Sequence, residues 1–283
     1  MSTPTAPSDL KIKPRDIAFG RGVKNARWWH GGDPIATNFF NALSLTFPQG
    51  EAYFVQSVRH FLNDLPQPLR GQVEDFAQQE AYHSREHMAF NRQVSDAGYE
   101  VRQIDALIRE DIRQTKDLEP EVHLAATAAL EHFTAMLAHA WLKDERHFKD
   151  CPPDIARLWQ WHSIEEIEHK GVAFDTFMYV TRDLSPFKRW LFRVAVMAQV
   201  TRDFTRERVR DLHLLFQQDG IDTPKTWRRL AGFLLFRPGL ISQVFLPYLS
   251  FYLPGFHPWG HDDRKLAAKM EQKLQLNPVA QAG

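Results

Sequence analysis

Residues 155–177, IARLWQWHSIEEIEHKGVAFDTF, decide the fold. Every third or fourth residue of this stretch lies on one face of an α-helix. That face carries Ile155, Trp159, His162, Glu166, His169, Ala173 and Phe177. It should be apolar, yet a carboxylate and two imidazoles stand in its middle. Because buried acids and imidazoles are costly unless they are paired or ligated, the stretch predicts a helix that faces a polar site inside a protein core.

Two other stretches repeat this pattern. The first places a Glu and two His on its core face, in the series Val73, Phe76, Glu80, His83, His87, Phe90 and Val94. The second places a Glu there, in the series Leu124, Thr127, Glu131, Thr134, Ala138 and Trp141. Three core faces with ionisable residues at mid-length call for a common explanation.

The remaining sequence also favours helices, because its long polar–apolar runs lack Gly and Pro and no strand alternation is bounded by turn residues. We therefore expect an all-α protein with helical stretches over 37–65, 68–97, 120–147, 154–182, 186–219, 224–235 and 263–276. The first stretch should be interrupted at 47–50, with its second half starting near Glu51. We expect an irregular N-terminal arm over 1–34, a four-helix bundle over 35–183, and a C-terminal helical extension over 184–283 that packs on or covers the bundle.

Two Glu-x-x-His pairs point to a dinuclear metal site. Glu80 with His83, and Glu166 with His169, each place two ligands on one helix face, one turn apart. A single Glu from each of two further helices would complete the ligand pattern of ferritin-like di-iron carboxylate bundles. The core faces therefore predict a ferritin-like four-helix bundle with two metal ions at its centre.

Glu51 and Glu131 are the expected single carboxylates. Glu51 and Glu80 are 29 residues apart, and Glu131 and Glu166 are 35 apart. A chain that runs about 14 residues along one helix, turns, and runs back along the next returns to the level at which it started. It travels about 21 Å in each direction. The 48 residues from His83 to Glu131 leave room for the long crossover of such a bundle.

Two further histidines lie near these pairs. His162 precedes Glu166 by four residues, so it shares their face and is an expected third ligand from that helix. His87 follows His83 by four residues and is a weaker candidate, either a ligand or a hydrogen-bond partner of one, as against a plain polar residue at the pocket edge.

A buried salt-bridge network without metal is the competing interpretation. Its weakness is that no Lys or Arg lies on these faces. Glu165 and Glu168 lie off the core face, so we expect them to be solvated or to support ligands from outside. Four histidines without partners at ligand spacing are interpreted as surface or core-edge residues: His60, His132, His139 and His147.

Three segments carry a resemblance to a known family. They are ALS at 42–44 with FPQGE at 47–51 and VR at 58–59, QExxHxxxH at 79–87, and WHxxEExEHK at 161–170. Over about residues 35–260 the chain resembles the bacterial family of predicted metal-dependent hydrolases. The His-x-x-x-Glu-x-x-His arrangement is also similar to that of arylamine N-oxygenases, which are ferritin-like di-iron enzymes with a third histidine ligand. That resemblance implies the ligands Glu51, Glu80, His83, Glu131, His162, Glu166 and His169, and an O2-dependent monooxygenase.

The donor types agree with iron or manganese. Carboxylate and imidazole without thiolate suit Fe, or Mn, rather than structural zinc, and four carboxylates neutralise two divalent ions. The main hypothesis is a non-haem di-iron monooxygenase that hydroxylates or N-oxygenates a small, largely apolar substrate with O2 as co-substrate. A di-metal hydrolase, which would use the pair to activate water, is the alternative, and a non-catalytic iron-binding protein is a further one.

Composition limits the partners. Lys+Arg and Asp+Glu number 35 each, which excludes the broad basic field of a dedicated nucleic-acid binder. The single cysteine and the lack of a Gly-x-Gly-x-x-Gly motif after a strand leave no place for an electron-transfer module. An oxygenase would therefore need an external ferredoxin or reductase. No apolar stretch near the N-terminus is typical of a signal peptide, so we expect a cytoplasmic protein.

The segment 238–256 contains no charged residue. Three prolines interrupt it, which disfavours a transmembrane span despite its length. It could pack against the bundle, form a lid, or make peripheral contact with a membrane. Its aromatic residues would equally suit a wall over an apolar substrate pocket or a homodimer contact.

Overall fold

Helices account for the regular secondary structure of the described part of the chain. The computed structural model describes residues 5–20 and 24–276; residues 1–4, 21–23 and 277–283, which include the ends of the expected arm and extension, lie outside it. The described ranges contain ten α-helices, three short 3-10 helices and no strand. The all-α prediction is therefore confirmed.

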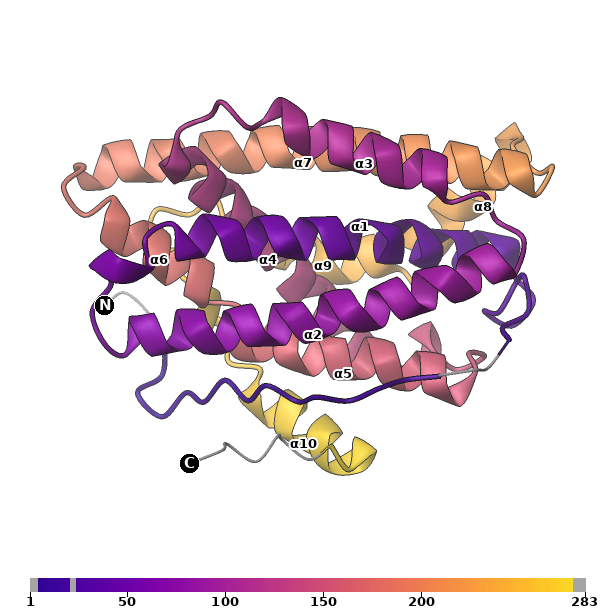
Figure 1. Cartoon of the computed structure of the whole chain (residues 1–283), viewed down its shortest axis with the longest axis horizontal. Coiled ribbons are helices and arrows are strands. Elements are labelled where there is room, and N and C mark those ends of the chain that lie inside the picture. The colour runs from indigo at the N-terminus through magenta and orange to yellow at the C-terminus, as the bar shows by residue number, and fades with distance from the viewer. Residues whose placement is uncertain (1–4, 21–23, 277–283) are drawn as a thin grey trace.

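Four long helices form the bundle. They are α1 (Pro34–Arg59), α2 (Leu69–Asp96), α4 (Pro120–Lys143) and α5 (Pro153–His169). α1 packs chiefly on α2 and α4 chiefly on α5, and further contacts join the two pairs (Figure 1). This pairing fits the expected ferritin-like bundle.

Two apolar clusters fill the two ends of the bundle. One joins the first half of α1 to the second halves of α2 and α4 and to α5, and includes Phe40, Phe90 and Trp159. The other joins the second half of α1 to the first halves of α2 and α4, and includes Val58 and Phe76. The three core faces are therefore apolar at both ends, and their ionisable residues lie between the clusters.

α1 is continuous through Pro48, so the expected interruption at 47–50 was wrong. Proline has no N–H, so it cannot donate to the carbonyl of Ser44 four residues earlier. The side-chain amide of Asn91 on α2 donates to that carbonyl at 3.0 Å instead. A neighbouring helix thus satisfies the acceptor that Pro48 leaves free.

The expected single helix over 154–182 is two helices, α5 and α6 (Val172–Val180), separated by Lys170 and Gly171. A Cβ on Gly171 would lie 2.7 Å from the indole nitrogen of Trp259. Lys170 turns toward Asp263, where its ammonium donates to a carboxylate oxygen at 3.0 Å. Tertiary contacts with the C-terminal segment therefore accompany a break that helical periodicity does not reveal.

The remaining helices surround the bundle. They are α3 (Arg102–Gln114), α7 (Pro186–Gln218), α8 (Pro224–Leu235), α9 (Leu240–Ser250) and α10 (Arg264–Leu274). α7 packs on α1 and α4, α9 on α4, and α10 on α5. α3 and α9 were not among the expected helices. The 3-10 helices are Leu62–Asp64, Glu145–His147 and Pro258–Gly260; the first two occupy the ends of stretches that were expected to remain α-helical.

The N-terminal arm lies along the outside of the bundle. Its described residues form no helix before Pro34, where Asp33 caps α1 by accepting the N–H of Ile35 at 2.8 Å. Figure 1 shows the arm running lengthwise along the bundle, between α5 and α10. The arm thereby reaches the side of α5 that faces away from the bundle centre.

Candidate metal centre

Seven ionisable side chains from four helices meet in the middle of the bundle. We call them the central cluster: Glu51 from α1, Glu80 and His83 from α2, Glu131 from α4, and His162, Glu166 and His169 from α5. Each is at most 4% exposed. They are the seven residues that the sequence predicts as ligands, and the fold brings all of them together.

The donor atoms of the central cluster form three overlapping groups of metal-binding type. In each group one donor atom per residue lies within 4.8 Å of the others: Glu51 with His83 and His162, Glu80 with Glu131 and His169, and Glu80 with His83 and Glu166. Glu80 and His83 each belong to two groups, so the groups are contiguous.

Most of these donor atoms have no hydrogen-bond partner. The buried atoms without one are Glu51 Oε1, both oxygens of Glu80 and of Glu131, Glu166 Oε2, His83 Nδ1 and His169 Nε2. A buried polar group without a partner normally costs 1–3 kcal/mol, and more if it is charged. Eight such atoms pointing into one small volume fit a bound cation, and the donor set fits two divalent ions.

The imidazole of His83 is held from outside the cluster. Its Nδ1 faces inward, 3.7 Å from oxygens of Glu80 and of Glu166. Its Nε2 donates to Glu165 Oε2 at 3.1 Å. A proton fixed on Nε2 leaves the Nδ1 lone pair for the centre, which is the usual outer support of a metal-binding histidine.

His169 is oriented in the same way by a different partner. Its Nδ1 lies 2.9 Å from the side-chain oxygen of Gln79, which can only accept. The amide nitrogen of Gln79 donates to Glu168 at 2.9 Å, which fixes the orientation of that amide. The Nε2 of His169 faces Glu80, Glu131 and Glu166 at 3.3–3.5 Å.

His162 is supported by a chain of hydrogen bonds that includes His87. Its Nδ1 lies 2.7 Å from His87 Nε2, and His87 Nδ1 lies 2.8 Å from Ser44 Oγ. Ser44 uses its only proton to donate to Asn91 Oδ1 at 2.7 Å, so His87 Nδ1 must donate to Ser44. His87 Nε2 then accepts from His162 Nδ1. The relay leaves His162 Nε2 facing Glu166 Oε1 at 2.7 Å and Glu51 Oε1 at 3.8 Å.

His87 therefore lies behind His162 and not in the central cluster. Of the two roles considered for it, the geometry matches the hydrogen-bond partner. Burial, and then the proximity of His162, lower its pKa well below the usual range, which keeps it neutral within the relay. Burial and His162 likewise lower the pKa of His83.

The four carboxylates of the cluster do not titrate alike. Burial raises the pKa of Glu51, Glu80 and Glu131 well above the usual range, and repulsion from neighbouring carboxylates adds to this rise. Burial also acts to raise the pKa of Glu166, but contacts with His169 and His162 outweigh it and hold that pKa well below its usual range. Without a metal, the cluster therefore keeps protons to a higher pH than separate, solvated carboxyl groups would.

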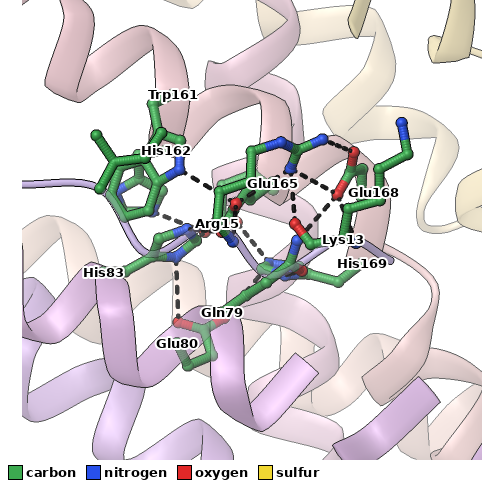
Figure 2. Close-up of polar contacts among 12 residues, drawn as sticks. Lys13, Arg15, Gln79, Glu80, His83, Trp161, His162, Glu165, Glu168 and His169 are labelled. Atoms are coloured by element: carbon green, nitrogen blue, oxygen red, sulfur yellow. Dashed lines mark hydrogen bonds and ion pairs between the residues drawn. The ribbon is translucent and has the colours of Figure 1, made fainter. Parts of the chain in front are cut away.

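A second set of acids lies beside the central cluster. The sequence did not predict Arg15, the residue that balances their charge. Arg15 of the arm is fully buried and pairs with Glu165 at 3.1 Å and with Glu168 at 2.6 Å (Figure 2). It also pairs with Glu271 of α10 at 2.8 Å. We call these four residues, with Lys13, the arm cluster. Glu165 is fully buried, so expecting it to be solvated was wrong, whereas its contact with His83 matches an outer support.

Nothing in the arm's sequence singles out Arg15, because the arm has no helical period. The core faces do lack Lys and Arg, as the sequence indicates. Arg15 reaches the far side of α5 and pairs with the acids there. The carboxylates of the central cluster are left without a Lys or Arg partner in the described residues.

The four histidines that were expected at the surface or the core edge occupy several environments. His60 is exposed, whereas His132 and His147 are buried. His139 lies beside His261 and Asp263, a further group of metal-binding type. The ammonium of Lys170 lies 3.0 Å from Asp263 and already supplies that group with a positive charge.

One cavity of the structure is lined by chain neighbours of two central-cluster residues. A cavity of about 690 Å³ lies beneath α9, and its lining includes His132 and Lys170, the chain neighbours of Glu131 and His169. Its lining includes none of the seven residues of the central cluster.

Comparison with known proteins gives one result. A family model described as "Predicted metal-dependent hydrolase" matches residues 13–262. No curated protein and no solved structure matches the chain.

Proposed function

This chain belongs to the predicted metal-dependent hydrolase family, and we propose that it is a dinuclear metal enzyme whose two ions are held by the central cluster. The observation that carries the proposal is the set of eight buried donor atoms without hydrogen-bond partners. Four carboxylates would neutralise two divalent ions, and three imidazoles would complete the ligand set. Carboxylate and imidazole without thiolate favour Fe or Mn.

We propose hydrolysis of a small substrate as the reaction, in line with the description of the family. Two bound ions would supply Lewis acidity to a substrate oxygen and lower the pKa of water to near neutrality. The chain's own contribution is orientation. Glu165, Gln79 and His87 each fix the outer nitrogen of one imidazole, and the hydroxyl of Ser84 donates to Glu51 at 2.8 Å.

An O2-dependent monooxygenase is the second candidate, and burial favours it. The central cluster lies between two apolar clusters, and each of its residues is at most 4% exposed. Such a position admits a small apolar reactant such as O2 more readily than a bulky polar substrate. With redox-active ions bound, the centre would supply electrons to O2, and an external ferredoxin or reductase would replace them.

The identity of the bound metal and the presence of O2 distinguish hydrolysis from oxygenation. Protein depleted of metal and reloaded under argon with Fe(II), Mn(II) or Zn(II) is assayed on small esters and amides, and its O2 consumption with a reductant is then measured. A hydrolase works under argon and retains activity with Zn(II), which has no redox chemistry. An oxygenase consumes O2 with iron or manganese, and is inactive under argon and with Zn(II).

Matched variants tie either activity to the centre. Glu80→Gln removes a carboxylate shared by two donor groups, whereas Glu74→Gln changes an exposed residue of the same helix. We expect Glu80→Gln alone to lower both the bound metal and the activity. Activity that survives in Glu80→Gln, or that persists in metal-free protein, contradicts the proposal.

A further inference from the structure

Exposed apolar side chains gather on one part of the surface. Fourteen large hydrophobic residues are exposed in the described part of the chain, and seven of them fall between residues 235 and 253. We call these seven the α9 face: Leu235, Phe236, Ile241, Phe245, Leu246, Leu249 and Leu253. Phe236 and Leu246 are the most exposed, at 76% and 75%. Such a concentration on a water-soluble surface normally marks an interaction site.

α9 is apolar on both of its sides. Leu240, Val244 and Tyr248 pack against the core, and the carbonyl of Pro247 accepts a hydrogen bond from His132 of α4 at 3.0 Å. The opposite side carries Ile241, Phe245 and Leu249 at steps of four, so these three side chains form a stripe along the outside of the helix. A helix on a protein surface usually has a polar outer side, and this one does not.

The charged residues of the segment that carries the α9 face have a single sign, and Asp144 of a neighbouring segment accepts a hydrogen bond from Gln243 of α9 at 3.3 Å. Residues 223–261 contain Lys225, Arg228, Arg229 and Arg237 and no Asp or Glu, although the whole chain has no net charge. All four cations are exposed. Arg229 lies 3.5 Å from Asp33, whereas Lys225, Arg228 and Arg237 form no ion pair with any described residue. The apolar stripe therefore lies on a segment that can attract anions.

We propose that the α9 face docks on a membrane surface that carries anionic lipid headgroups. Apolar side chains would enter the boundary between headgroups and acyl chains, and the basic residues would meet lipid phosphates. Figure 1 shows α9 beyond α1, with α8 at its end, so the docking segment is distinct from the helices that build the central cluster. The proposal does not depend on the metal chemistry.

Contact along a membrane surface suits this segment better than a span or a dimer. No single helix among the described residues has the length and apolar character to cross a bilayer, and α8 with α9 passes that test only as a pair bent by 59°. In a two-fold dimer the same patch of each copy meets its equivalent. Such a dimer would set cation against cation, because the segment offers no acid.

Vesicle co-sedimentation of the full chain tests the proposal. We expect the protein to bind vesicles of phosphatidylcholine mixed with phosphatidylglycerol, and to bind pure phosphatidylcholine vesicles about tenfold more weakly or less, because several basic residues contribute. Binding should also fall as salt is raised. No binding to the mixed vesicles, or equal binding to both kinds, overturns the proposal.

Two double variants separate the contributions of the α9 face. Phe236→Ser with Leu246→Ser removes the two most exposed apolar side chains, and Arg228→Glu with Arg237→Glu reverses two unpaired charges. We expect each double variant to reduce binding to the mixed vesicles by about tenfold or more. All four residues are exposed, so the melting temperature should not change and serves as the check on folding.

Leu118→Ser and Lys116→Glu are the matched controls. Both residues are exposed in the connection between α3 and α4, and both changes should leave binding unaltered. Equal loss in the controls overturns the proposal. So does a concentration-dependent dimer, seen by light scattering, that the Phe236→Ser, Leu246→Ser variant abolishes, because the α9 face would then be a contact between copies.

Discussion

Two clusters of buried acids lie side by side in this protein, and they balance their charge differently. In the arm cluster, Glu165 and Glu168 are paired with the guanidinium of Arg15. In the central cluster, Glu51, Glu80 and Glu131 leave five oxygen atoms without hydrogen-bond partners. Burial of carboxylates alone therefore does not indicate a metal site. The lack of a protein cation to balance them does.

Adjacent residues of α5 belong to different clusters. Glu165 faces Arg15, and Glu166 faces the central cluster, where it lies 2.7 Å from His162. His83 joins the two clusters, because Glu165 holds its outer nitrogen. If this comparison is right, the two clusters must respond in opposite ways to the loss of a charge and to the loss of metal.

Arg15→Met should have the largest effect. It leaves Glu165 and Glu168 buried without their cation, and loss of one partner of a buried pair costs about 3–5 kcal/mol of unfolding free energy. Urea denaturation should show a similar loss with metal and with chelator. Lys13→Met, which removes a half-exposed partner of Glu271, should cost less than about 1 kcal/mol. An unchanged unfolding free energy in Arg15→Met would mean that the arm cluster is not balanced as described.

Removal of metal should have the next largest effect, and it acts on the central cluster. Metal that binds the folded chain alone adds about 2.7 kcal/mol to the unfolding free energy at a hundred times its dissociation constant. For a chain of this size that is a rise in melting temperature of about 5–10 °C. Melting curves with chelator and with Fe(II) under argon measure it. A salt-bridge network without metal predicts identical curves.

Removal of one carboxylate should distinguish the clusters most sharply. Glu131→Gln deletes one of several like charges, so the metal-free protein should keep its stability or gain about 1 kcal/mol, while the metal-dependent rise becomes smaller. Glu271→Gln deletes a partner of Arg15 that contacts no residue supporting the central cluster, so it should lower stability in both states and leave the metal-dependent rise intact. Thermal melts of both variants with and without metal give the comparison. The reverse pattern would exchange the roles assigned to the two clusters.

The pH dependence of the metal-free protein tests the same comparison through the slope of stability against pH. Glu51, Glu80 and Glu131 have raised pKa values when folded, so the folded chain holds protons that the unfolded chain releases. Stability must then fall as pH rises above about 4.3, the ordinary Glu pKa, until each folded carboxyl releases its proton, by up to about 1.4 kcal/mol per pH unit for each such proton.

The lowered pKa values of His83 and His87 oppose this trend only below about pH 6.5, where the unfolded imidazoles take up protons. Metal ligation requires deprotonated carboxylates, so the loaded protein should lose the part of the decline that comes from Glu51, Glu80 and Glu131. Burial also raises the pKa of Glu165 and of Glu207, which are not ligands, so their part of the decline should remain. Urea denaturation at several pH values, with chelator and with metal, measures both slopes. A flat profile in the metal-free protein would contradict the raised pKa values.

The core of the site could be predicted from the sequence because helical periodicity encodes it. Steps of three and four place Glu80 and His83 on one face and Glu166 and His169 on another. The chain lengths between single and paired ligands, 29 and 35 residues, bring those faces to one level. The ligand prediction thus needed only local geometry and chain length. The same kind of pattern, in Ile104, Ile108 and Ile112, was also sufficient to indicate α3, which was overlooked.

The remainder depends on contacts between distant segments, which no local pattern records. Arg15 comes from an arm without a period, and it meets Glu165 across 150 residues of chain. α1 continues through Pro48 because Asn91 of another helix satisfies the freed carbonyl. α5 ends where Trp259, nearly ninety residues later, lies against Gly171. Each of these features becomes visible only when the fold is known.

Metal content is the most direct test of the claim that metal ions, and not a protein side chain, balance the charge of the central cluster. Wild-type protein, Glu80→Gln and Glu271→Gln are loaded with Fe(II) under argon, freed of excess metal and analysed for iron per chain. We expect two iron ions per chain in the wild type and in Glu271→Gln, and a clear loss in Glu80→Gln, whose carboxylate belongs to two of the three donor groups. Less than one iron ion per wild-type chain, or full occupancy in Glu80→Gln, would contradict it.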